Sequence, residues 1–191
     1  MSDPITGVQL SRRFYENYIV PRLSSVVPTL SFASALVGPG SEVLGFDTPM
    51  SRDHDWGPRV MIFVREADVS QSETIFAALH KAAPASFNGF PLKVDQTIVS
   101  TVPVYYGKRL GISPARLFDG LELFDWLTVP SQTLAELTGG TVYRDDFGEL
   151  TAVREHLRFY PQDVWIYLMA SVWNRMRTGG ASYAQSRICG R

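Results

Sequence analysis

The chain has 191 residues, of which 45% are hydrophobic and 12% aromatic, so it can bury a sizeable core and is not an extended disordered protein. Its formal net charge of -1 provides no overall basic field, which disfavours a nucleic-acid partner. No stretch reaches the roughly 18 apolar residues of a membrane span, and no signal peptide is recognisable, so we expect no membrane partner. The single cysteine, Cys189, forms no internal disulfide, and we expect a cytoplasmic protein.

The N-terminal third of the chain is predicted to form one helix and two strands. Apolar residues recur at helical spacing over 10–23, which predicts a helix that is disturbed at Pro21. The stretch 30–37 predicts a strand, because it is apolar and is followed at once by the turn Gly38-Pro39-Gly40. The run 59–64 is short, apolar and partly β-branched, which indicates a buried second strand.

A capped helix and a further extended segment complete this N-terminal unit. The sequence Ser70-Gln71-Ser72-Glu73 has the form of a capping box, and the apolar stripe behind it predicts a helix that ends before Pro84. The next stretch, 91–101, has an extended composition, and a helix is predicted over 102–111. Together these elements predict a compact α/β unit over residues 1–112.

The second part of the chain is predicted to be mostly helical, with one small hairpin. Short helices are expected between 114 and 139. A turn signal at 145–148, between two short extended pieces, predicts a hairpin over 141–150. We therefore expect a helical part with a small hairpin over 113–178, followed by a frayed tail over 179–191.

The end of the chain reads as two helices, the second of which begins at Pro161, where a missing N–H costs nothing. Apolar side chains of this last helix repeat at three and four residues, which indicates that they belong to the core. The repeating residues are Val164, Leu168, Ser171, Val172 and Met176. Trp165 and Tyr167 are likewise expected to pack against the protein.

The stretch "GPGSEVLGFDTPMSRDHDWGP", residues 38–58, contains the candidate site. At the entrance of a strand, alternate residues point the same way, so Asp53 and Asp55 are expected to share a face. Two neighbouring carboxylates suit Mg²⁺, which completes its octahedron with water and substrate phosphate. In the preceding turn, Gly40 removes a Cβ from the path of an anion, and Ser41 adds a hydroxyl donor. The pattern therefore predicts a site for a metal-chelated triphosphate.

Two arginines flank these aspartates. Arg52 and Arg59 either reach a bound triphosphate or form ordinary ion pairs with nearby carboxylates, and the sequence leaves both interpretations open.

The order Gly40-Ser41, eleven intervening residues and Asp53-His54-Asp55 resembles the signature of the nucleotidyltransferase superfamily, which has the DNA polymerase beta-like fold. The segment "SRDHDWGPR" and residues 125–173 resemble a bacterial branch catalogued as domain of unknown function 4037. The resemblance covers roughly residues 10 to 177.

The resemblance implies an α+β fold, in which a nucleotidyltransferase-like unit with a short mixed sheet flanked by helices precedes a small, mostly helical part. It implies Mg²⁺-dependent transfer of a nucleoside monophosphate from a nucleoside triphosphate to a hydroxyl acceptor. Gly40 and Ser41 would then bind phosphate, and Asp53 and Asp55 would be catalytic ligands of one or two Mg²⁺ ions.

The chain departs from the superfamily pattern in two places. The superfamily supplies a third carboxylate from a later strand. Here Asp95 is the catalytic candidate, although the best register with the branch puts Ile98 or Val99 at that position. The relatives also continue with helices that line the acceptor side of the cleft, whereas this chain ends in a different tail. A catalytically inactive nucleotide-binding or regulatory module of the same fold is therefore the alternative.

Overall fold

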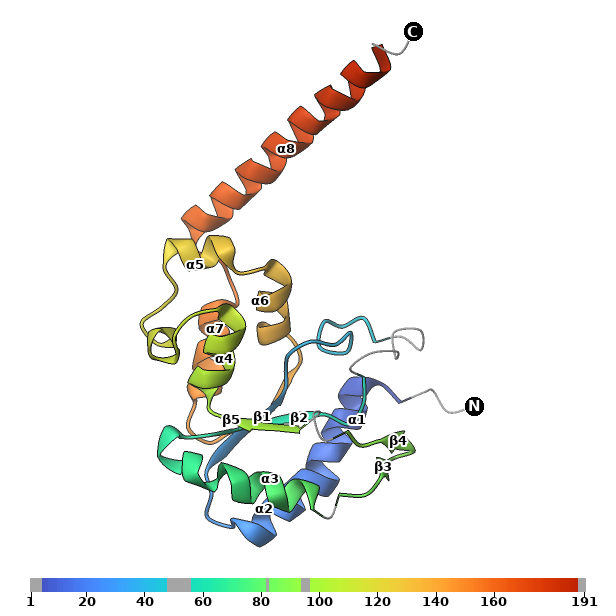
Figure 1. The fold of residues 1–191 in the computed structure, drawn as a ribbon, viewed down its shortest axis with the longest axis vertical. Coiled ribbons are helices and arrows are strands. Elements are labelled where there is room, and N and C mark those ends of the chain that lie inside the picture. Colours follow the sequence, from blue (N-terminus) through green and yellow to red (C-terminus); the bar gives the residue numbers. More distant parts are fainter. Residues whose placement is uncertain (1–4, 48–55, 82, 94–96, 189–191) are drawn as a thin grey trace.

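The computed structural model describes residues 5–47, 56–81, 83–93 and 97–188, the last ten as backbone only. The protein has a mixed α+β architecture, as predicted, with a four-stranded sheet between two sets of helices (Figure 1). None of the described helices is both long enough and apolar enough to cross a membrane.

The strands of the sheet lie in the order β5–β2–β1–β6. Their bounds are Thr97–Ser100 for β5, Val60–Val64 for β2, Phe32–Leu36 for β1 and Thr141–Asp145 for β6. Strand β1 is antiparallel to β2 and to β6, whereas β2 and β5 are parallel. The end of β1 and the starts of β2 and β5 therefore lie at one edge of the sheet. The predicted strands at 30–37 and 59–64 are confirmed.

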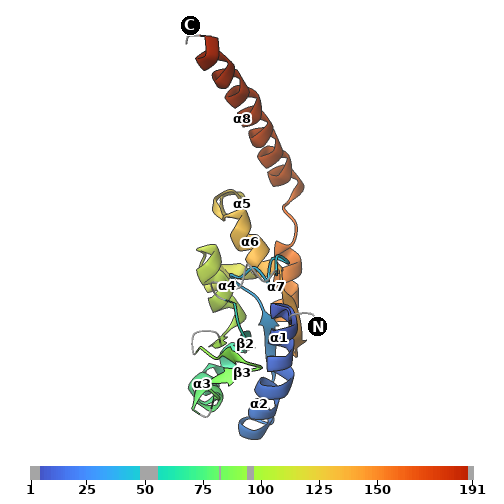
Figure 2. The same ribbon diagram turned by 90° about the vertical axis from the view of Figure 1, so that its right-hand side faces the viewer.

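The two central strands are buried on both faces, which explains why β1 and β2 are continuous apolar runs. One face packs against the N-terminal helical segment and α3 (Ser72–His80). The other face packs against α4 (Val102–Leu110), α6 (Ser131–Thr138) and α7 (Glu149–Leu157). Figures 1 and 2 show these two groups of helices on opposite sides of the sheet.

The N-terminal helical segment runs from Gly7 to Val26 and contains the predicted disturbance. It consists of α1 (Gly7–Phe14), a π-helical turn η1 (Tyr15–Ile19) and α2 (Val20–Val26). Pro21 lies in the first turn of α2 and has no N–H to offer to the preceding turn. The helix is thus confirmed, with wider bounds than the sequence indicated.

The predicted capping box at residues 70–73 does not form. A 3-10 helix, η3 (Glu66–Gln71), runs directly into α3, so Ser70 lies inside a helical turn and not in front of one. The first N–H of α3 donates to the carbonyl of Val69 instead. The helix itself is confirmed and ends at His80, before Pro84.

A short hairpin that the sequence analysis did not predict joins β3 (Ser86–Phe87) to β4 (Phe90–Pro91). Its turn residues, Asn88 and Gly89, both have positive φ angles, 48° and 82°. This is the Asn-Gly signal of a tight β-hairpin turn, and it was present in the sequence.

The predicted hairpin over 141–150 is wrong. Only its first half is a strand, because β6 pairs with β1 and the chain then enters α7. The carboxylate of Asp145 accepts hydrogen bonds from the N–H groups of Gly148 and Thr151, at 3.0 and 2.8 Å, and so ends the strand and caps the helix. The next residue, Asp146, accepts from Arg144 Nε at 2.7 Å, and this bond lowers the pKa of Asp146.

The region between α4 and α7 contains short helices, as expected. A 3-10 helix, η5 (Pro114–Leu117), precedes α5 (Leu123–Thr128), and α6 ends at Gly139.

The last helix, α8 (Gln162–Ile188), projects from the body of the protein in both views (Figures 1 and 2). It continues through Ile188, where a frayed tail was expected. Val164 is buried and Leu168 is half-buried, but the prediction that the other apolar residues of this helix are core is wrong. The exposed residues are Trp165, Tyr167, Val172 and Met176.

Candidate functional site

The candidate site lies at the edge of the sheet where β1 ends and where β2 and β5 begin. The turn Gly38–Ser41 follows β1 directly. Val60 and Thr97, the first residues of β2 and β5, are register partners. The starts of β2 and β5 therefore lie at the same edge of the sheet as the turn, and the predicted acids precede these strands in the sequence.

The turn requires glycine at two positions. Gly38 and Gly40 have φ angles of 101° and 140°. A Cβ on Gly40 would lie 2.7 Å from Arg59 Nη2 and 2.7 Å from each carboxylate oxygen of Glu42. A Cβ on Gly38 would lie 2.6 Å from the hydroxyl oxygen of Tyr105. Both distances are shorter than the contacts that Cβ atoms make in proteins. A side chain at Gly38 or Gly40 would therefore displace its neighbours.

A buried ion pair lies against the turn. Arg59 Nη2 is 2.7 Å from Glu42 Oε1, and the two residues are only 4% and 2% exposed. The second terminal nitrogen of Arg59 donates to the carbonyl oxygen of Pro39. Arg59 is therefore an ion-pair partner of Glu42 and not a free cation. Burial raises the pKa of Glu42, and the neighbouring guanidinium opposes that rise.

Arg59 is itself held from the opposite side by α1 and β6. The Ser11 hydroxyl donates to the carbonyl oxygen of Arg59, and the Tyr143 hydroxyl donates to Ser11 Oγ at 2.8 Å. Burial raises the pKa of Tyr143 to about 12, so its hydroxyl stays a neutral donor at physiological pH. The start of β2 is thus fixed relative to the turn through a chain of buried polar contacts.

A second arginine, which the sequence analysis missed, lies beside the turn and retains contact with solvent. The side chain of Arg109, in α4, is 33% exposed and stacks over the ring of Tyr105, 5.7 Å from its centroid. Its Nη1 is 3.6 Å from Glu136 Oε2, and its Nη2 would be 3.5 Å from a Cβ on Gly38. The carbonyl oxygen of Glu136 also accepts the Gly38 N–H at 3.0 Å. Arg109 is therefore a partly exposed cation beside Gly38 that is also paired with Glu136.

The residues on either side of segment 48–55 are joined to each other. The indole N–H of Trp56 donates to Asp47 Oδ1 at 3.1 Å, and the N–H of Gly7 donates to the other oxygen of that carboxylate. The ring of Trp56 also packs edge-on against Phe90, with centroids 4.7 Å apart. Asp47 and Trp56 are therefore fixed next to each other and to the start of α1.

Four of the predicted site residues lie outside the described part of the chain. These are Arg52, Asp53, Asp55 and Asp95. The two predicted phosphate-binding residues, Gly40 and Ser41, lie in the turn described above. Within the described ranges, no cluster of three or more His, Cys, Asp or Glu side chains has the arrangement of a metal site.

The register that best matches the resembling branch places Ile98 or Val99 at the position of the third carboxylate, and neither residue has an acidic side chain. Ile98 is 37% exposed and pairs with Met61, whereas Val99 packs on the opposite face, against the α1–α3 side. If a third carboxylate comes from this segment, it has to be Asp95, which precedes β5 in the sequence.

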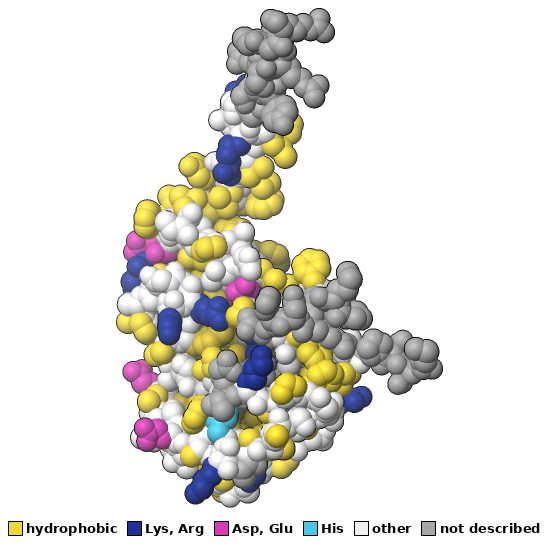
Figure 3. Space-filling view, turned by 45° about the vertical axis from the view of Figure 1, so that its right-hand side comes forward, with side chains coloured by type: hydrophobic (Ala, Val, Ile, Leu, Met, Phe, Trp, Pro, Cys, Tyr) yellow, Lys and Arg dark blue, Asp and Glu magenta, His cyan; other side chains and the backbone are white. Residues whose placement is uncertain are grey.

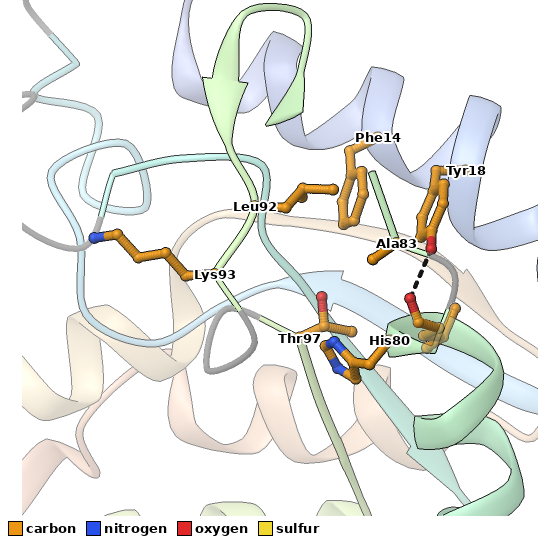
Figure 4. A pocket seen from close by; sticks show the side chains of 8 residues that line it. Phe14, Tyr18, His80, Ala83, Leu92, Lys93 and Thr97 are labelled. Carbon is orange, nitrogen blue, oxygen red and sulfur yellow. Dashed lines mark hydrogen bonds between the residues drawn. The ribbon is translucent and has the colours of Figure 1, made fainter. Parts of the chain in front are cut away.

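A small cavity lies on the α1–α3 side of the sheet and does not belong to the candidate site. It has a volume of about 40 Å³ and lies between Phe14, Tyr18, His80 and Leu92 (Figure 4). The Tyr18 hydroxyl closes one side by donating to the carbonyl of Leu79 at 2.6 Å. Because a small-molecule site usually needs about 300 Å³ or more, this cavity has room for water but not for a nucleotide.

Comparison with known proteins bears on the C-terminal third of the chain. Residues 126–191 match the model of a family described as Domain of unknown function (DUF4037). The resemblance to this family is thus confirmed over that stretch, which extends from α5 through α8. Searches of curated proteins and of solved structures gave no significant match.

Proposed function

We propose that the protein is a cytoplasmic Mg²⁺-dependent nucleotidyltransferase, which moves a nucleoside monophosphate from a nucleoside triphosphate to a hydroxyl acceptor. The observation that supports this proposal best is the turn Gly38–Ser41. Its two glycines have positive φ angles of 101° and 140°, and it lies at the edge of the sheet where β2 and β5 begin. Asp53 and Asp55 precede the first of these strands, and Asp95 precedes the second.

In this proposal the turn holds the phosphates. Gly38 and Gly40 give the turn its shape through their positive φ angles, and neighbouring side chains of the protein fill the space where a Cβ would lie. Ser41 adds a hydroxyl, and Arg109 adds a partly exposed positive charge beside Gly38. Arg52 is a further candidate contact to the triphosphate.

The acidic residues fit a divalent metal by their chemistry. Asp53 and Asp55 would hold one or two Mg²⁺ ions, since carboxylate oxygens beside a phosphate are the ligands that Mg²⁺ prefers. Bound magnesium would neutralise charge on the triphosphate, so that the acceptor oxygen bonds to the α-phosphorus while the bond to the β-phosphate breaks and pyrophosphate leaves. Asp95 would accept the proton of the attacking hydroxyl group.

A second candidate function is nucleotide binding without turnover, in a regulatory module of the same fold. The composition of β5 favours it, because the register that best matches the resembling branch puts Ile98 or Val99 where the superfamily has its third acid. The two functions differ in the product and not in the ligand, so both predict that the turn binds a nucleotide.

The binding test is calorimetric titration of each common nucleoside triphosphate, with Mg²⁺, into the wild type and into an Asp53→Asn/Asp55→Asn variant. Asp119→Asn, a substitution at an exposed position away from the turn, is the matched control. We expect binding by the wild type and the control and loss of binding by the double variant. Equal binding by all three proteins would refute the assignment.

Turnover is then tested with α-labelled nucleoside triphosphates and a panel of hydroxyl-bearing acceptors. A labelled adduct that forms with the wild type and not with Asp95→Asn supports the transferase. Tight binding without any labelled product supports the regulatory module.

A further inference from the structure

Helix α8 carries a continuous stripe of exposed apolar side chains. The stripe, here called the α8 stripe, consists of Trp165, Ile166, Met169, Val172, Trp173 and Met176, which are between 38% and 72% exposed. The helix projects from the body (Figures 1 and 2), and Figure 3 shows hydrophobic side chains gathered around its base. Exposed apolar patches of this size mark interaction sites in soluble proteins.

The α8 stripe is distinct from the face by which α8 joins the protein. Val164 is buried in the core, and Leu168 packs against it. At roughly 100° per residue, Val164 and Leu168 lie about 140° and 100° around the helix from the centre of the α8 stripe. The body of the protein therefore leaves the stripe uncovered while holding the base of the helix.

We propose that the α8 stripe pairs with the same stripe of a second copy of this chain, with the two helices antiparallel. Ile166, Met169, Trp173 and Met176 follow each other at intervals of three, four and three residues, which is the spacing of a coiled-coil seam. An antiparallel pair centred on Ser171 brings Ile166 opposite Met176 and Met169 opposite Trp173. Each of these contacts occurs twice, so the surface is self-complementary, as a two-fold interface requires.

The charges on α8 favour the antiparallel arrangement. Asp163 and Arg177 lie two heptads apart and therefore flank the seam on the same side. In the antiparallel pair, Asp163 of each copy comes beside Arg177 of the other copy, at both ends of the seam. In a parallel pair, Arg177 would face the uncharged Val172, and the position facing Asp163 would be residue 158, which lies before the start of α8. In the antiparallel pair, the positive end of each helix dipole also lies beside the negative end of the other, which is not so in a parallel pair.

The exposed area is sufficient for a stable dimer. If a large side chain has about 200 Å² of surface, the exposed fractions correspond to on the order of 650 Å² per copy. A standard protein interface buries about 800 Å² on each partner, and the polar side chains around the seam supply the difference.

The proposal is tested by the mass of the full chain in solution, measured by light scattering during size-exclusion chromatography over a dilution series. We expect twice the monomer mass of 21.3 kDa for the wild type. Ile166→Glu and Trp173→Glu should give monomers, because each places a charge in the seam. Asn174→Glu adds the same charge on the opposite side of α8 and should remain dimeric. Circular dichroism melts verify that every variant is folded.

The orientation is tested by disulfide trapping in a Cys189→Ser background. A mixture of Ile166→Cys and Met176→Cys chains should form a mixed disulfide, whereas Ile166→Cys alone should form none. Disulfides in Ile166→Cys alone would overturn the antiparallel pairing. A monomeric wild type, or a dimer that Trp173→Glu leaves intact, would overturn the use of the α8 stripe by a second copy. This inference does not depend on the proposed enzymatic activity.

Discussion

Replacing Arg59 by methionine tests whether the buried ion pair holds the candidate phosphate-binding turn. Arg59 and Glu42 are 4% and 2% exposed, and their charged atoms are 2.7 Å apart. The substitution leaves Glu42 buried without its partner and leaves the carbonyl of Pro39 without its donor. Removing one member of a buried pair typically costs about 3–5 kcal/mol of the free energy of unfolding. We expect Arg59→Met to fall in that range.

The matched control is the double variant Glu42→Met/Arg59→Met. Because apolar residues of similar volume often replace a buried ion pair without loss of stability, this variant should recover most of the lost free energy. Arg59→Lys keeps the charge but not the forked geometry that reaches Glu42 and Pro39 together, so it should lie between the wild type and Arg59→Met.

Urea unfolding measures the stability of these variants, and calorimetry measures their affinity for MgATP. We expect the double variant to be folded but to bind MgATP poorly, since the turn has lost its directional contacts. Two results would refute the reasoning. One is an Arg59→Met variant that loses less than about 1 kcal/mol, as at a surface pair. The other is a double-mutant cycle in which the losses of the single variants Glu42→Met and Arg59→Met add up to the loss of the double variant. That result would mean that the pair does not interact.

Three further predictions concern single positions. Gly40→Ala should cost about 1–3 kcal/mol in urea unfolding and abolish MgATP binding, whereas Gly45→Ala, also at positive φ but with nothing within 4 Å, should retain binding. Arg109→Ala should weaken MgATP binding about 10- to 100-fold in calorimetry with little change in melting temperature, and its neighbour control Lys108→Ala should not. Asp146→Asn should be less stable than the wild type at neutral pH, and the difference should shrink in acid denaturation as the pH falls below 3.8, because the folded-state pKa of Asp146 is lowered from that value.

Local signals predicted the central strands and the helices well. β1 and β2 are apolar runs bounded by glycine and proline, and that pattern is enough to identify buried strands. β6 was predicted as half of a hairpin, because a turn signal shows where a strand ends but not which strand it pairs with. Its actual partner is β1, with Ala33 opposite Asp145, more than a hundred residues away in the sequence.

The candidate site was predictable in part, for the same reason. The turn Gly38–Ser41 could be identified, because glycine requirements are local. Arg109 could not, since the distance between α4 and the turn depends on how β5 returns to the sheet. The role of Arg59 was left open by the sequence, and the structure resolves it in favour of an ion pair, although the partner is Glu42 and not a neighbouring aspartate.

The buried pair also bears on the shape of the turn. If the Glu42→Met/Arg59→Met variant is as stable as we expect, the ion pair is not needed to keep the protein folded. Arg59 supplies directional hydrogen bonds, because its two terminal nitrogens bind the carbonyl of Pro39 and the carboxylate of Glu42 at the same time. Such contacts define the shape of the backbone from Gly38 to Ser41. Loss of MgATP binding in the double variant that keeps its stability would therefore separate the shape of the turn from the stability of the fold.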